Sequence, residues 1–223
     1  MRVRGSYGKS FHAPSFNDLH YPGFSNPLLK PERSTSVDVG LLSELKIFGF
    51  RQSLELTYFH LDTRDKILFD LTVFLPRNIG HSTSSGVEFR YEIVSGNGLL
   101  GWGGSYSLVE AVNKTTPGDQ AYGKQLLFIP EKSGKLWMWV SFGSWRATMA
   151  HNVVGRRYIT DDNETFLDSF GILNVSLSCR LPLGFVKGYG KVEANNAFNK
   201  DFQVFPSYPM PRRTYRATFG VEF

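Results

Sequence analysis

The sequence predicts an all-β fold in which about ten antiparallel strands form a portion of a transmembrane β-barrel. Three observations support this prediction. Apolar and polar residues alternate along most of the chain, short connections alternate with long ones, and 15% of the 223 residues are aromatic. The composition also excludes intrinsic disorder, because 41% of the residues are hydrophobic and only 20% are charged.

The alternation has the period of a β-strand. At the C-terminus, Tyr215, Phe219 and Val221 lie on one parity, while threonine, arginine, glycine and glutamate occupy the other. Segments 173–181 and 87–93 repeat the pattern. Such segments predict strands with one apolar and one polar face. No window of comparable length predicts a capped amphipathic helix, so we expect little helix.

Taken in order along the chain, the alternation predicts ten strands. They lie near residues 2–11, 33–43, 52–63, 82–93, 98–111, 132–142, 145–157, 168–180, 186–197 and 212–223. Short connections are expected near 95–97, 143–144 and 182–184, with a slightly longer one near 46–50. Long connections are expected at 12–32, 64–81, 112–131, 158–167 and 198–211. This asymmetry is typical of transmembrane barrels, in which short turns face the periplasm and long loops face outside.

The two parities predict which face meets lipid. The apolar parity suits hydrocarbon, and the polar parity suits a water-filled or plugged lumen, since the reverse costs roughly 2–4 kcal/mol for each Arg or Lys near the midplane. Aromatic residues near strand ends are expected to form an interfacial girdle. They are Tyr7, Phe11, Tyr58, Phe59, Trp137, Trp139, Trp145, Tyr158 and Phe223. The alternative is that these aromatics form the core of a soluble β-sandwich.

Several motifs are recognisable in their order along the chain. Residues 11–14 read Phe-His-Ala-Pro, residues 26–32 read Asn-Pro-Leu-Leu-Lys-Pro-Glu, and residues 85–88 read Ser-Gly-Val-Glu. Residues 194–202 read Ala-Asn-Asn-Ala-Phe-Asn-Lys-Asp-Phe, and Pro-Arg-Arg-Thr at 211–214 leads into the closing strand. From about residue 4 to 223 the chain resembles the barrel of TonB-dependent outer-membrane receptors. His12 and Asp38 depart modestly from the Arg and Glu usual in that family.

The resemblance implies a place in the bacterial cell outer membrane and TonB-energised uptake of a scarce nutrient. The ligand classes implied are ferric siderophores, haem and cobalamin. The partners implied are the TonB complex, acting through a plug domain, the barrel-assembly machinery, outer-membrane lipid and lipopolysaccharide. Relatives of this kind have a plugged barrel of about 22 strands. We therefore expect residues 1–223 to be the C-terminal part of such a receptor barrel, without plug, export signal or N-terminal strands, and inactive in transport alone.

The candidate ligand-binding residues are defined by their positions in the long loops, because aromatic side chains give rigid contact area at low entropy cost. They are Tyr21, Phe24, Asn26, Tyr122 and Tyr208. The resemblance also implies a C-terminal signal for the barrel-assembly machinery. Its residues are Tyr215, Phe219, Val221 and Phe223.

No catalytic set, metal site or cofactor is predicted. The five histidines show no close ligand spacing, and the single cysteine, Cys179, excludes an internal disulfide. His12, Asp18 and His20 share one loop but are better explained as polar loop residues, and Asp161-Asp162-Asn163-Glu164 predicts an acidic turn at the outer surface. We expect no enzyme activity.

The charge pattern leaves two interpretations. The net charge is +5, and the densest basic positions are the pairs at 156–157 and 212–213, beside long loops. They predict either a cationic rim that attracts anionic ligands or ordinary solvated charge, but not nucleic-acid binding. Two other functional classes stay open: a passive outer-membrane pore or structural barrel, and a soluble all-β carbohydrate-binding module.

Overall fold

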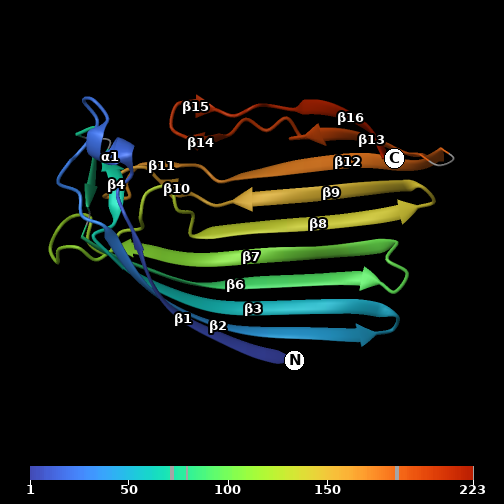
Figure 1. Cartoon of the computed structure of the whole chain (residues 1–223), viewed down its shortest axis with the longest axis horizontal. Coiled ribbons are helices and arrows are strands. Elements are labelled where there is room, and N and C mark those ends of the chain that lie inside the picture. Colours follow the sequence, from blue (N-terminus) through green and yellow to red (C-terminus); the bar gives the residue numbers. More distant parts are fainter. Residues whose placement is uncertain (71–72, 79, 184–185, 223) are drawn as a thin grey trace.

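The chain forms a ten-stranded antiparallel sheet in which each long strand pairs with the next one along the sequence (Figure 1). The structure is a computed structural model that describes residues 1–70, 73–78, 80–183 and 186–222. The sheet consists of β1 (Arg2–His12), β2 (Glu32–Ile47), β3 (Phe50–Arg64), β6 (His81–Ser95), β7 (Leu100–Asn113), β8 (Lys132–Phe142), β9 (Trp145–Val154), β12 (Phe170–Leu183), β13 (Val186–Asn195) and β16 (Thr214–Glu222). All ten predicted strands are therefore confirmed, with ends displaced by a few residues.

Short connections join the strands at one end of the sheet. The prediction of a longer connection near 46–50 is wrong, because β2 and β3 are joined by Phe48 and Gly49 alone. Both residues have positive φ, 50° and 78°, as the favoured two-residue hairpin turn requires. Gly143 and Ser144 join β8 to β9 as expected. The predicted turn at 182–184 begins inside β12, and Gly184 lies outside the described residues.

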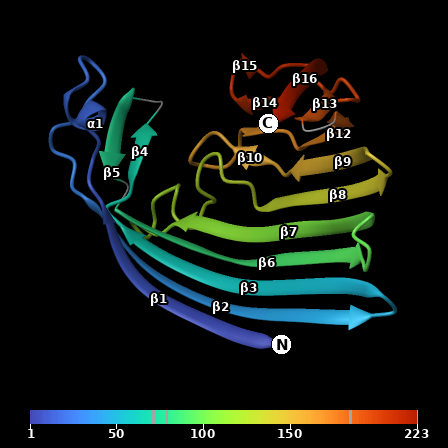
Figure 2. The same cartoon turned by 45° about the vertical axis from the view of Figure 1, so that its right-hand side comes forward.

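The long connections lie at the other end and carry small elements of their own. These are α1 (Phe16–His20), β4 (Ile67–Asp70), β5 (Leu75–Asn78), β10 (Arg157–Tyr158), β11 (Phe166–Leu167), β14 (Gln203–Phe205) and β15 (Tyr208–Pro209). Three hairpins result, β4–β5, β10–β11 and β14–β15. Figure 2 shows α1, β4 and β5 rising together beyond the end of the sheet. In the described part of the chain, no helix is long and apolar enough to cross a membrane.

The strand register confirms that apolar side chains share one face of the sheet. Leu56 pairs with Phe89, and Phe89 pairs with Tyr106 on the next strand. These side chains remain 40%, 40% and 45% exposed, so no second layer covers them in the described structure. The buried apolar residues of the described chain are few and lie mostly near the long loops, for example Leu29 and Leu126. An exposed apolar face without a packed core argues against the soluble sandwich.

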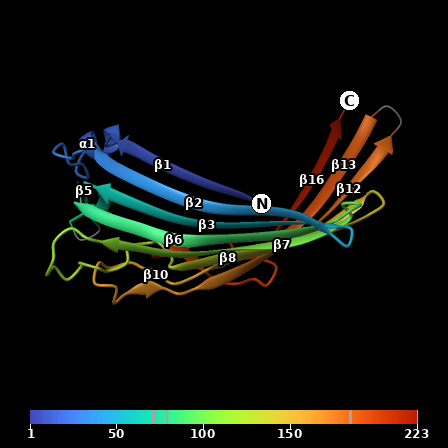
Figure 3. The same cartoon turned by 90° about the horizontal axis from the view of Figure 1, so that it is seen from below.

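The sheet is curved into an open trough whose rims are β1 and β16 (Figure 3). On the polar face, Arg4 of β1 reaches over Gly40 of β2 and donates to Glu55 of β3 at 2.5 Å. A Cβ at Gly40 would lie 2.8 Å from the Arg4 side chain, so glycine keeps this path open. Side chains converge on the concave face of a curved sheet, where they can contact each other across an intervening strand. The Arg4–Glu55 contact is therefore consistent with a polar face inside the trough.

Three residues assigned to the aromatic girdle lie on the polar face instead. Phe59, Trp137 and Trp139 pair directly with Gly86, Gly103 and Gly101, respectively. Each ring covers a position that has no side chain of its own, and a Cβ there would approach a ring atom within 2.7 Å. The girdle assignment is wrong for these residues because an aromatic ring opposite glycine packs on the sheet itself. Phe223 lies outside the described residues.

Candidate functional site

The long loops form the candidate site, and the first two are held together by polar side chains. Asn26 donates to the carbonyl of Pro76 at 3.2 Å. Asn78 accepts from the backbone N–H of Lys30 at 2.9 Å and donates to the carbonyl of the same residue at 3.0 Å. The loop that carries α1 is therefore fixed against the β4–β5 hairpin. Nearby, burial lowers the pKa of Lys66, and Glu32 opposes that shift.

A second junction joins the loop after β7 to the β10–β11 hairpin. Gln125 is buried, and its side chain accepts from the backbone N–H of Ala111 at 2.9 Å. Asn163 accepts from the Gln125 backbone N–H at 2.7 Å and donates to the Gln125 carbonyl at 2.9 Å. Asn163 adopts a positive φ of 59°, which asparagine tolerates better than most residues. This reciprocal pair positions the acidic turn that the sequence predicted.

A third junction depends on Arg157, which is only 4% exposed. Its guanidinium donates to the carbonyls of Gln203 at 3.0 Å and Asp168 at 3.2 Å and lies over the ring of Phe170. Desolvation lowers the pKa of Arg157. The interpretation of residues 156–157 as a pair of rim charges is wrong for Arg157, because its guanidinium is engaged inside the loop layer. Arg212 pairs with Asp201 at 2.7 Å in an exposed ion pair.

Between these loops lies an open acidic cavity of about 670 Å³, lined by the β4–β5 hairpin, the loop after β7 and the β10–β11 hairpin. Asp70, Asp119 and Asp161 line it, and Arg77 pairs with Asp70 at 2.7 Å. The pKa of Asp161 is raised, chiefly by burial and then by Asp70, Asp119 and the neighbouring Asp162. The cavity therefore presents negative potential to whatever enters it.

The predicted ligand-binding residues do not form one cluster. Tyr21 and Phe24 contact each other at 6.2 Å between ring centroids, and Tyr122 lies under the ammonium of Lys114. Tyr208 stands 67% exposed on β15. Asn26 holds the loops together rather than pointing into the cavity, and none of the five candidates lines the acidic cavity. Their role in binding stays a prediction.

The histidine loop contains no ligand set. Asp18 and Ser15 form a reciprocal capping box at the start of α1, with hydrogen bonds of 2.9 and 3.1 Å. The His20 ring packs on Phe16 at 4.9 Å. Across the part of the chain that the structure describes, no group of three His, Cys, Asp or Glu side chains could hold a metal ion.

Sequence patterns missed the residues that organise this face. Gln125 is an isolated polar residue in an irregular segment without a hydrophobic period, and Arg157 is visible in the sequence as one of a basic pair but not as a buried residue that joins loops. The only available signal for Gln125 was a polar side chain immediately before the apolar run at 126–129. The structure brings such residues together from loops that are distant in sequence.

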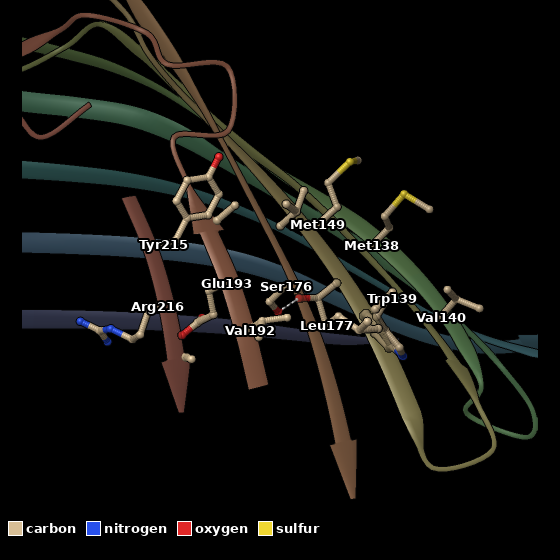
Figure 4. Close-up of a pocket in the computed structure, with 15 residues that line it drawn as sticks. Met138, Trp139, Val140, Met149, Ser176, Leu177, Val192, Glu193, Tyr215 and Arg216 are labelled. Atoms are coloured by element: carbon tan, nitrogen blue, oxygen red, sulfur yellow. Dashed lines mark hydrogen bonds between the residues drawn. The ribbon is translucent and has the colours of Figure 1, made fainter. Parts of the chain in front are cut away.

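A hollow of about 800 Å³ lies on the sheet itself and is lined only by residues of β8, β9, β12, β13 and β16 (Figure 4). Its apolar lining includes Met138, Met149 and Tyr215. Ala147 and Ala217 contribute small side chains, which leaves room between the larger ones. Residues of both parities line the hollow, since Trp139, Glu193 and Arg216 of the polar parity contribute to it as well, so it does not belong to the apolar face alone.

The C-terminal strand presents the predicted assembly residues on the apolar parity of the sheet edge. Tyr215, Phe219 and Val221 are 75%, 83% and 59% exposed, respectively. In the described structure β16 pairs only with β13. This exposure is compatible with recognition by another protein, but the assembly role itself stays a prediction.

Comparisons with known proteins agree with this architecture. A family model described as "TonB dependent receptor-like, beta-barrel" matches residues 1–199. The vitamin B12 transporter BtuB of Photobacterium profundum is 25% identical over 232 residues, covering 100% of this chain and 36% of the relative. The vitamin B12 transporter BtuB of one Vibrio vulnificus strain is 25% identical over 230 residues, covering 98% of this chain and 34% of the relative. The chain thus spans about a third of the length of these relatives.

Solved structures show the same fold. The copper transporter OprC superposes with a TM-score of 0.73 at 20% identity, covering 97% of this chain and 35% of that chain. The ferric yersiniabactin uptake receptor FyuA from Yersinia pestis superposes with a TM-score of 0.68 at 17% identity, covering 98% of this chain and 34% of that chain. At these identities the likeness concerns the fold alone.

Proposed function

Because the chain belongs to the TonB-dependent receptor-like β-barrel family, we propose that it is part of an outer-membrane receptor for TonB-energised nutrient uptake. The family match over residues 1–199 is the observation that carries this proposal. The names of the relatives support cobalamin and ferric siderophores as ligand classes. Haem is a third class, which the sequence resemblance alone implies.

The described geometry supports a place in the outer membrane. The exposed apolar face would contact lipid, the polar face would line the lumen, and the elaborated loops would face outside. We propose that residues 1–223 are the C-terminal part of the barrel and that a plug domain and further strands complete it. Contact with the TonB complex would be made through that plug. These residues alone would not transport.

The loop face is the proposed site of ligand capture. Tyr21, Phe24 and Tyr208 are exposed aromatics that would supply contact area, and Tyr122 lies beside Lys114. Asn26 would act by holding its loop in place.

The C-terminal strand is the proposed assembly signal. During insertion the barrel-assembly machinery would recognise its residues Tyr215, Phe219, Val221 and Phe223.

Growth and uptake experiments with the intact gene test this function. Deletion should abolish growth when a single cobalamin or ferric-chelate source limits the cells, and uptake of that radiolabelled source should need a functional TonB complex. Uptake that persists without TonB would favour the passive-pore alternative. Normal growth of the deletion strain on every source tested would contradict the proposed function.

A further inference from the structure

The loop face consists of two units that face each other across the acidic cavity. The α1 loop and the β4–β5 hairpin form the first loop unit, because Asn26 and Asn78 bond one to the other. The loop after β7 and the β10–β11 hairpin form the second loop unit, because Asn163 bonds Gln125 in both directions. Residues of both units line the cavity of about 670 Å³.

The two loop units are joined where β6 and β7 end. The carbonyl of His81 accepts from the backbone N–H of Lys114 at 2.9 Å, and the backbone N–H of His81 donates to the hydroxyl of Thr115 at 3.2 Å. At the turn of the second unit, the carboxylate of Asp161 accepts no hydrogen bond and forms no ion pair within the described residues. The units can therefore change their separation about this junction without breaking a bond of Asp161.

Apolar side chains on both walls favour closure of the cavity. Leu68 and Phe69 line it from the first unit, and Leu127 and Ile159 line it from the second. Phe69 is 44% exposed. Because bringing the two walls together removes apolar surface from water, closure has a hydrophobic driving force.

Carboxylates on the same walls oppose closure. Asp70 belongs to the first unit, Asp119 and Asp161 belong to the second, and all three line the cavity. Arg77 pairs with Asp70 at 2.7 Å and is the only cation among the described lining residues. At neutral pH, closure therefore brings like charges together in a space with less water, where their repulsion is stronger than in bulk solvent.

Asp161 is the carboxyl group whose charge responds most readily to acid. Its pKa is raised above the ordinary 3.8 first by burial and then by Asp70, Asp119 and Asp162, while Arg77 acts in the opposite direction. As the pH falls toward 3.8, Asp161 therefore takes up a proton before an ordinary aspartate does.

The neighbouring Asp162 behaves in the opposite way. Its carboxylate accepts from the hydroxyl of Thr160 at 2.6 Å and from the backbone N–H of Glu164 at 2.9 Å. These hydrogen bonds lower the pKa of Asp162, and Lys124 adds to the effect. Asp162 therefore stays charged while Asp161 becomes neutral, so protonation of the turn concerns the side chain that carries no bond.

We propose that the acidic cavity is a proton-operated gate, in which the two loop units close on each other when Asp161 is neutral and stand apart when it is charged. At neutral pH the cavity is open to a ligand, and an acidic medium closes it. The gate rests on the proposed function in one respect, since it regulates access to the loop face as the site of ligand capture. The motion itself does not depend on uptake.

The test measures the separation of the two loop units in the full-length gene product, purified in a neutral detergent with a metal chelator present. Spin labels are attached at Val73→Cys on the first unit and Thr165→Cys on the second, both exposed, and Cys179→Ala removes the cysteine of this chain. Double electron–electron resonance compares the label distances at neutral pH and at pH 3.8. Acid should raise the ratio of the short-distance to the long-distance population by about tenfold, because one charge–charge repulsion is lost.

Variants of the turn assign the response to one side chain. Asp161→Asn should give the short-distance population at both pH values, and Asp161→Glu should restore the pH response. Glu164→Gln removes a charge from the same turn, but Glu164 does not line the cavity, so this control should respond as the wild type does.

The gate is overturned if the wild-type distances do not change with pH, or if Asp161→Asn responds to pH as the wild type does. Equal effects of Asp161→Asn and Glu164→Gln would assign the response to the net charge of the turn and overturn it as well. Heat-modifiable mobility on gels shows whether each variant has folded. If Asp161→Asn does not fold, Asp119→Asn replaces it and should increase the short-distance population at neutral pH.

Uptake assays separate the gate from the proposed function. Loop units that close in acid, in a protein that supports no uptake, would contradict only the proposed function. Uptake by a protein whose loop units keep the same separation at both pH values would contradict only the gate.

Discussion

At the residue scale, glycine decides where the large rings of the polar face can lie. Trp137 of β8 passes over Gly103 of β7, and its indole N–H donates to Glu92 of β6 at 3.1 Å. Arg90, also on β6, lies 5.0 Å from the centroid of the same ring. Three strands are thus linked above one position that has no side chain. The pairing explains why tryptophans at 137 and 139 occupy a face that is otherwise polar.

Substitution of Gly103 should destabilise the sheet. A Cβ at this position would lie 2.6 Å from the backbone carbonyl oxygen of Tyr91 and 2.7 Å from the Trp137 ring. Because the backbone at Tyr91 cannot shift without destabilising the sheet, Gly103→Ala should lower the free energy of unfolding by about 1–3 kcal/mol. Denaturant unfolding of the detergent-solubilised protein, followed by tryptophan fluorescence, measures this loss.

Gly104→Ala is the matched control on the same strand. A Cβ added at Gly104 would lie 2.9 Å from the flexible end of the Leu136 side chain, and no backbone atom would be nearer than 3.4 Å. The control should therefore cost less than Gly103→Ala. Equal unfolding midpoints for the two variants would contradict the role assigned to the glycine–tryptophan pair.

Asp161 makes the acidic cavity sensitive to pH. Its pKa is raised above the ordinary 3.8, first by burial and then by the surrounding carboxylates. Just above pH 3.8 the folded protein therefore holds a proton that the unfolded chain releases. Local stability falls as the pH rises through that window and stays lower at neutral pH, where the charged form is penalised.

Asp161→Asn should therefore strengthen hydrogen-exchange protection of residues 159–165 at neutral pH and have little effect below pH 3.8. The substitution removes the repulsion at neutral pH, whereas acid already neutralises the wild-type carboxyl group. Glu164→Gln is the control, because Glu164 lies on the same turn but, unlike Asp161, does not line the cavity. A gain in protection that is the same at both pH values would contradict the assignment of the effect to ionisation of Asp161.

At the scale of elements, the period of two predicted every long strand because each of these strands presents one face to water and the other to an apolar environment. The same signal could not detect β10, β11, β14 or β15, which are only two or three residues long. The expectation of an aromatic girdle is wrong for Phe59, Trp137 and Trp139, because the position of an aromatic residue near a strand end does not show that a glycine stands opposite its ring. The parity of these residues along their strands does indicate the polar face, in agreement with the pairing.

The register of β12 gives a direct test of the two faces. Val175 lies on the apolar face between Met149 and Ala194, and Ser176 lies on the polar face, hydrogen-bonded to Thr148 at 2.6 Å. Val175→Arg should impair membrane assembly strongly, by about 2–4 kcal/mol near the midplane. Ser176→Arg should cost only about 1 kcal/mol, for the lost hydrogen bond. The folded fraction in outer-membrane preparations, measured by heat-modifiable electrophoresis, compares them, and equal impairment would contradict this assignment of faces.

At the scale of the whole molecule, the sequence predicted where the candidate site lies but not which residues organise it. Long loops at one end followed from strand spacing, and the acidic turn at 161–164 was visible as a charge run. The contacts of Gln125 and Arg157 join loops far apart in sequence, so no local pattern could contain them. The loop position of Asn26 predicts a ligand contact, whereas in the structure its amide donates to the carbonyl of Pro76 in another loop.

The two rims of the trough determine how this chain should behave by itself. In the described structure β1 pairs only with β2, and β16 pairs only with β13, so each rim exposes a row of backbone donors and acceptors. Within hydrocarbon each unsatisfied group costs several kcal/mol, which means that the sheet needs further strands or closure of β1 on β16.

We therefore expect residues 1–223, refolded alone in detergent, to associate through their edges and to run without heat-modifiable mobility. If further strands complete the barrel as proposed, the protein that contains them should form a compact heat-modifiable species. Size-exclusion chromatography with light scattering gives the mass of each species. A monodisperse, heat-modifiable monomer in detergent would mean that ten strands close on themselves. A cooperatively folding monomer without any detergent would instead restore the soluble-module alternative, since the exposed apolar face would then have to be covered by the chain itself.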